Sequence, residues 1–106
     1  MFTLFFVLPQ LGWADELLIP TAANSRVGSV TLVVQWTPQS QFAGYYVARS
    51  KGIYKERGLD VQILHGGPGV DPMALLRDGK ADFSTMFLTG AIAARDSGIP
   101  VVNIGQ

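Results

Sequence analysis

The sequence predicts an α/β fold with a mainly parallel sheet flanked by helices. Short apolar runs rich in β-branched residues recur along the chain, at residues 30–36, 59–64, 81–86 and 101–104. Segments in which apolar residues have helical spacing separate these runs, and glycine or proline stands at most of the junctions. Strands that alternate with helices are typical of parallel sheets, because each helix returns the chain to the same edge.

The first junction between a strand and a helix is the most informative stretch of the chain. Trp36 stands at the carboxyl end of the first apolar run. We expect Thr37 to cap a helix over residues 39–51, with Pro38 in its first turn. Gly44 lies inside this helix at a cost of about 1 kcal/mol, which indicates a close approach by another backbone. Such junctions point free N–H groups into a crevice where small ligands bind.

Residues that start or stop helices set the ends of the later elements. Gly52 and Gly58 are expected to end the first helix and a short turn that follows it. Asp71 can cap a second helix that has Pro72 at its first position. A third helix is expected to open at residue 89 or 90 and to run to residue 95. The expected elements are therefore four strands and three helices.

The N-terminal fourteen residues carry no charge and are expected to be a signal peptide that exports the protein to the periplasm. An apolar run at residues 2–8 precedes Gly-Trp-Ala at residues 12–14, the small-residue spacing of a cleavage site. The basic residue that usually opens a signal peptide is missing, so a buried strand is the alternative for this run. Residues 15–29 lack periodicity and are expected to be a tether, followed by the folded domain at residues 30–106.

Composition excludes several classes of site. Eight basic and eight acidic residues give a net charge of zero, so no basic patch predicts nucleic-acid binding. The chain has no cysteine, which excludes a thiolate nucleophile and cysteine-ligated metals. His65 is the one histidine, and no acidic pair or ligand cluster has a diagnostic spacing. We therefore predict no catalytic residue, no metal and no cofactor.

A glycine-rich loop and a group of aromatic residues are the candidate binding features. The loop at residues 65–69 matches neither a dinucleotide fingerprint nor a P-loop. It can either cradle a polar group with its N–H groups or be a tight turn that requires glycine. In a parallel sheet, Trp36, this loop and residues 87–89 would line one crevice. Aromatic faces with a few polar groups suit a flat heterocycle. We expect Trp36 in this crevice, and Phe42 and one of the two tyrosines in the core.

These residues carry a resemblance to a known family. Residues 33–46, Val-Val-Gln-Trp-Thr-Pro-Gln-Ser-Gln-Phe-Ala-Gly-Tyr-Tyr, are followed by Gly-Gly-Pro-Gly at 66–69 and Gly-Lys-Ala-Asp-Phe at 79–83. The pattern resembles solute-binding proteins of ABC importers, in the branch named for thiamine-pyrimidine precursor binding and related to nitrate, sulfonate and taurine binders. The resemblance covers residues 30–106. It implies a type II periplasmic-binding-protein-like fold with two lobes, of which this chain supplies the first part of lobe one.

The resemblance also implies a function and a site. It implies extracytoplasmic binding of a small heterocyclic nutrient for import, with an ABC permease and ATPase as partners. Contact with the membrane would be made only through the permease or through a signal or lipid anchor. A ligand-sensing input domain of a membrane signalling protein is the alternative. The implied ligand-binding residues are Gln35, Trp36, Tyr45, Tyr46, Gly67, Pro68, Gly69, Phe87, Leu88 and Thr89.

Fungal relatives of this branch that make the pyrimidine use a histidine near the start of the third helix and a cysteine-rich motif. Gly90 stands at the corresponding position here, and cysteine is absent. On these two departures we predict that the chain is not an enzyme.

Overall fold

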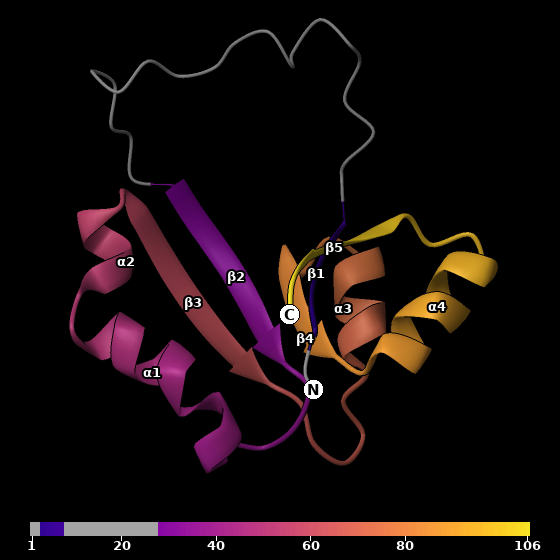
Figure 1. Cartoon of the computed structure of the whole chain (residues 1–106), viewed down its shortest axis with the longest axis horizontal. Helices are drawn as coiled ribbons and strands as arrows, with labels where there is room; N and C mark the ends of the chain where they lie inside the picture. Colours follow the sequence, from indigo (N-terminus) through magenta and orange to yellow (C-terminus); the bar gives the residue numbers. More distant parts are fainter. Residues whose placement is uncertain (1–2, 8–27) are drawn as a thin grey trace, which may run out of the picture.

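The computed structural model describes residues 3–7 and 28–106. In these residues five strands form one mixed sheet in the order β3-β2-β4-β1-β5 (Figure 1). β2 is parallel to β3 and β4, whereas β1 is antiparallel to both of its neighbours. The strands are β1 (Thr3–Val7), β2 (Gly28–Val34), β3 (Leu59–His65), β4 (Phe83–Met86) and β5 (Val101–Gly105). The predicted α/β class with a mainly parallel, helix-flanked sheet is confirmed.

Helices cover both faces of the sheet. The helical segments are η1 (Ser40–Phe42), α1 (Ala43–Ser50), α2 (Ile53–Glu56), α3 (Pro72–Arg77) and α4 (Leu88–Asp96). Val33 packs with residues of α3 and α4, whereas its neighbours Leu32 and Val34 pack with Phe42 and α1. Because successive side chains of a strand point to opposite faces, the two helix pairs lie on opposite sides of β2. No helix within the described ranges is long and apolar enough to cross a membrane.

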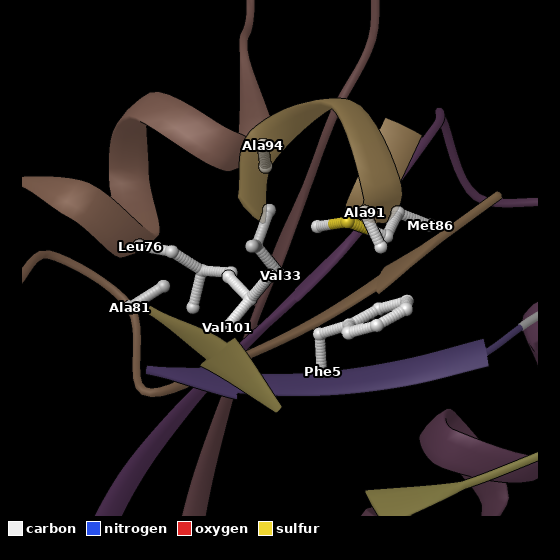
Figure 2. Packing of buried hydrophobic residues seen from close by; sticks show 8 residues of the cluster. All are labelled: Phe5, Val33, Leu76, Ala81, Met86, Ala91, Ala94 and Val101. Carbon is white, nitrogen blue, oxygen red and sulfur yellow. The ribbon is translucent and has the colours of Figure 1, made fainter. Parts of the chain in front are cut away.

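Two hydrophobic cores follow from this arrangement. The α3/α4 core contains the eight side chains drawn in Figure 2: Phe5, Val33, Leu76, Ala81, Met86, Ala91, Ala94 and Val101. The α1/α2 core contains Leu32, Val34, Phe42 and Val61, with partly buried residues such as Tyr45 and Tyr46 against them. Val33 and Val34 have no exposed surface, so β2 is the strand on which both cores meet.

β1 is a fifth strand beyond the four that were expected. It lies between β4 and β5, and Phe5 is only 2% exposed within the α3/α4 core. Residues 3–7 therefore form a buried strand in the structure, which was the alternative to a signal peptide for this apolar run. The cleavage motif at residues 12–14 and residues 15–27 of the expected tether lie outside the described residues, and export stays a prediction. Gly28 and Ser29, which were assigned to the tether, begin β2.

The cap predicted at Thr37 is wrong. Residues 35–38 form bends, Gln39 is the N-cap of η1 without a side-chain hydrogen bond, and α1 begins only at Ala43. The first helical turn is η1, which begins at Ser40, and its Phe42 is buried in the α1/α2 core. Thr37 is therefore too early in the sequence to cap the helix.

The boundaries set by Gly52, Gly58 and Asp71 are confirmed, whereas α4 begins at Leu88, one residue before the expected start, and ends at Asp96. Gly52 and Gly58 adopt positive φ values of 73° and 76°, which other residues adopt at a cost. Asp71 caps α3 by accepting a hydrogen bond from the Met73 N–H at 2.9 Å, and Pro72 is the first helical residue.

Candidate functional site

A pocket of about 530 Å³ lies at the edge of the sheet where β2 and β4 end. We call it the edge pocket. Its lining comes from the segment after β2 (Gln35, Trp36, Gln39, Gln41), the start of α3 (Asp71, Pro72, Met73) and the segment from β4 into α4 (Met86, Phe87, Thr89, Gly90). A volume of this size is typical of sites for small organic ligands.

The backbone of Gln35 is held from both sides. Its N–H donates a hydrogen bond of 3.0 Å to the hydroxyl of Thr85, a fully buried residue of β4. On the other side Gly66 packs so closely that an added Cβ would collide with the Gln35 carbonyl group. The Gly66 N–H also donates to the Val34 carbonyl at 2.7 Å. Gln35 therefore enters the edge pocket from a fixed position.

The side chain of Gln35 carries an unsatisfied acceptor. Its Oε1 atom is buried and has no hydrogen-bond partner within the described residues. A buried polar atom without a partner costs about 1–3 kcal/mol, and such atoms call for an explanation. Gln35 lines the edge pocket, so a donor on a bound ligand would satisfy this oxygen once the side chain turns toward the pocket.

Two aromatic rings at the edge pocket remain partly accessible. Trp36 is 45% exposed and Phe87 is 57% exposed, although both are large apolar side chains. They come from different junctions, Trp36 after β2 and Phe87 after β4. Exposed aromatic faces of this kind can stack on a flat ring, and Met73 and Met86 add apolar surface beside them.

Tyr45 and Tyr46 do not line the edge pocket. Both pack against the α1/α2 core, and Tyr45 lines a smaller apolar hollow of about 170 Å³ together with Tyr54. Burial raises the pKa of Tyr45, and the pKa of Tyr54 is raised by burial and then by the neighbouring Tyr45. The Tyr46 hydroxyl is buried without a hydrogen-bond partner in the described part of the chain.

The glycine loop lies beside the edge pocket but is not part of its lining. Gly67 and Gly69 have φ values of 142° and 79°, and Gly67 forms a bridge with Val70. The turn itself therefore explains the requirement for glycine at positions 67 and 69. Pro68 is exposed, and Leu88 at the start of α4 is 48% exposed and also outside the lining. Ligand contact by these residues stays a prediction.

Sequence reasoning thus reached part of the lining. It selected Gln35, Trp36, Phe87 and Thr89, all of which lie at the edge pocket. It missed the residues supplied by the start of α3 and by η1, as well as Met86 and Gly90. The Asp71-Pro72 cap was a usable signal, because it places the start of α3 after β3, at the edge where the parallel strands end. Among the described residues no cluster of His, Asp or Glu could hold a metal ion.

Known proteins show clear similarity to this chain. A family profile described as "NMT1/THI5 like" matches residues 39–106. The 4-amino-5-hydroxymethyl-2-methylpyrimidine phosphate synthase THI11 of Saccharomyces cerevisiae is 31% identical over 77 residues, which are 73% of this chain and 23% of the relative. The synthase of the same name from Aspergillus parasiticus is 32% identical over 77 residues, 73% of this chain and 22% of the relative.

A relative named for binding also matches. The formylaminopyrimidine-binding protein of Halalkalibacterium halodurans is 30% identical over 83 residues, which are 78% of this chain and 25% of the relative. The chain therefore spans about a quarter of the length of these curated relatives. No solved structure gives a significant match.

These matches contradict the prediction that the chain is not an enzyme. Several of the similar proteins are named as pyrimidine phosphate synthases, at about 31% identity. The prediction depended on Gly90 and on the absence of cysteine. The matched region is only about a quarter of each synthase. The absence of cysteine from this chain therefore does not bear on the parts of the synthases that lie outside the matched region.

Proposed function

The chain belongs to the NMT1/THI5-like family, and we propose that its edge pocket binds the ring of an aminopyrimidine nutrient related to thiamine precursors. The observation that carries this proposal is the neighbouring pair Gln35 and Trp36. Gln35 brings a buried oxygen without a partner, and Trp36 brings an exposed aromatic face. A flat heteroaromatic amine offers a donor for the first and a stacking surface for the second.

The printed names of the relatives support the same ligand class. One relative is named for binding a formylaminopyrimidine, and the synthases are named for an aminopyrimidine phosphate. We propose further that the whole protein acts outside the cytoplasm and delivers its ligand to an ABC permease and ATPase. The binding-protein relative supports this role. Genes for a permease and an ATPase beside this gene would favour it, and a transmembrane helix later in the same reading frame would favour sensing.

Synthesis of a pyrimidine phosphate is a second candidate function. It is favoured by the synthase relatives, among them those of Saccharomyces cerevisiae and Aspergillus parasiticus at 31% and 32% identity. The two candidates differ in what leaves the protein. A binding protein releases its pyrimidine unchanged, whereas a synthase yields the pyrimidine phosphate, and mass spectrometry of the released compound separates these outcomes.

The binding proposal is tested by titrating the isotope-labelled chain with 4-amino-5-hydroxymethyl-2-methylpyrimidine and following its amide and indole NMR signals. We expect shifts of signals from residues at the edge pocket and a dissociation constant of about 1 mM. Binding should be this weak because the 106 residues match about a quarter of the relatives' length and would enclose the ligand only in part. Trp36→Ala should weaken binding about tenfold through lost stacking. Val47→Ala on α1, where Val47 is 48% exposed and outside the pocket, is the matched control. Sub-micromolar binding would refute the incomplete enclosure, and absence of shifts would refute the proposal.

A further inference from the structure

Gln35 combines a fixed backbone with an unsatisfied side chain. Thr85 and Gly66 hold the backbone on its two sides, whereas the side-chain amide can turn about its own torsion angles. Its Oε1 atom is nevertheless buried without a partner within the described residues. A polar atom in this state is suited to a partner that arrives from outside the chain.

Two acceptor groups that line the edge pocket already have hydrogen-bond donors. The Gln41 amide nitrogen donates to Gln39 Oε1 at 2.8 Å, and the Asp71 carboxylate accepts from the Met73 N–H at 2.9 Å. The Gln39 and Asp71 oxygens are acceptors and cannot satisfy another acceptor. A ligand that presents an N–H group toward Gln35 therefore gains a hydrogen bond that these neighbours do not supply.

We infer that Gln35 is the residue that makes the pocket selective for pyrimidines with an exocyclic amino group. This inference rests on the proposed function. The carboxamide presents an acceptor and a donor side by side, and the amino group with its adjacent ring nitrogen presents the complementary donor and acceptor. Glutamine forms the same two-bond pair with the amino edge of adenine. Trp36, the next residue, would contact the face of the same ring while Gln35 contacts its edge.

Selectivity should arise mainly from rejection of the wrong ligand. A pyrimidine without the amino group would fill the pocket and exclude water, yet it would leave Oε1 buried and unpaired. Sites built to hydrogen-bond a substrate N–H discriminate strongly against analogues that lack it, because the protein's own polar group then loses its partner. The amino group would therefore contribute more to the difference in affinity than its small contact area suggests.

The test compares two probes, 4-amino-5-hydroxymethyl-2-methylpyrimidine and the same molecule without the amino group, on the full chain and on two variants. We expect the unaltered chain to prefer the amino compound about tenfold. Gln35→Met, which keeps the length and removes the amide, should reduce this preference to less than about twofold. Gln62→Met, the same change at an exposed position of β3 outside the pocket, should keep it.

Each outcome bears on a different claim. Equal affinity of the unaltered chain for the two probes overturns the selectivity of Gln35 and leaves pyrimidine binding intact. A Gln35→Met variant that weakens both probes equally also overturns it, since that pattern indicates a structural role. If the unaltered chain binds neither probe, the proposed function fails and the inference fails with it. The preference of the unaltered chain decides the matter if the variant does not fold.

Discussion

At the scale of single residues, Gly66 explains how the binding edge is built. It brings the loop after β3 against the Gln35 carbonyl group, where no side chain fits. Gly66→Ala should destabilise the fold by about 1–3 kcal/mol, because the added methyl group forces the two backbones apart. It should also weaken pyrimidine binding by displacing Gln35. Urea unfolding followed by circular dichroism measures the first effect, and unchanged stability would contradict the close packing.

Gly44 supplies the matched glycine control. A Cβ added to Gly44 meets no atom of residues 3–7 or 28–106 within 4 Å, so the close backbone approach expected from the sequence is wrong. Gly44→Ala should therefore stabilise the protein by up to about 1 kcal/mol through helix propensity. A destabilised Gly44→Ala variant would show that another surface covers this position.

Only some of the residues at the edge pocket could be predicted from the sequence. Trp36 could be selected because an aromatic residue at the carboxyl end of a strand stands where ligands bind. The unsatisfied state of Gln35 Oε1 could not be predicted, because it depends on which donors from α3, η1 and β4 come near. Tyr45 is an aromatic residue near the same junction as Trp36, but it packs against the α1/α2 core. Only the packing in the structure distinguishes the positions of these two residues.

At the scale of elements, the start of α3 depends on one capping bond. Asp71 accepts from the Met73 N–H at 2.9 Å, so Asp71→Ala should cost about 1 kcal/mol of stability. Asp78→Ala, at the other end of the same helix, removes only an exposed ion pair with Arg77 and should change stability by less than about 0.5 kcal/mol. Thermal unfolding of both variants measures the difference, and equal losses would refute the capping role.

The tyrosines of the α1/α2 core give the protein a pH dependence in the alkaline range. Burial raises the pKa of Tyr45 above 10.0, so the folded state holds the phenol proton more tightly than the unfolded state does. This contribution to stability is fully present below pH 10 and is lost as the pH rises through the folded-state pKa. Tyr54 should behave in the same way.

Tyr45→Phe removes one of the titrating groups and tests this linkage. Its urea midpoint should fall less steeply than that of the unaltered protein as the pH rises above about 10. Midpoints measured over a series of alkaline pH values give the two slopes. Identical slopes would show that Tyr45 titrates alike in the folded and unfolded states.

At the scale of the whole molecule, β1 determines whether the sheet is continuous. Among the strands that the structure describes, β5 pairs only with β1, and Phe5 is 2% exposed in the α3/α4 core. Phe5→Ala should therefore cost about 3–5 kcal/mol, and amide exchange of β5 should accelerate. Phe6→Ala should cost less, because Phe6 is only partly buried where it stacks on Phe83. A Phe5→Ala variant of unchanged stability would favour the cleaved leader over the strand.

Much of the architecture could be predicted because it depends on local sequence patterns. The alternation of apolar runs with helical segments predicts the succession of β2 to β5 along the chain. Asp71, Gly52 and Gly58 set helix boundaries through local chemistry. The role of residues 3–7 could not be predicted in this way. A short apolar run ahead of small residues has the same composition as a leader and as a buried strand, and its pairing with β4 and β5 joins residues about 80 to 100 positions apart.

The measurement that most directly tests the account is the set of intermolecular NOEs between 4-amino-5-hydroxymethyl-2-methylpyrimidine and the chain. The account predicts contacts from the ligand's methyl and ring protons to the Trp36 indole and the Phe87 ring, which lie at the edge pocket. Contacts to Tyr45 and Tyr54 would place the ligand instead in the apolar hollow over β2 and β3. That result would contradict the assignment of pyrimidine binding to Gln35 and Trp36.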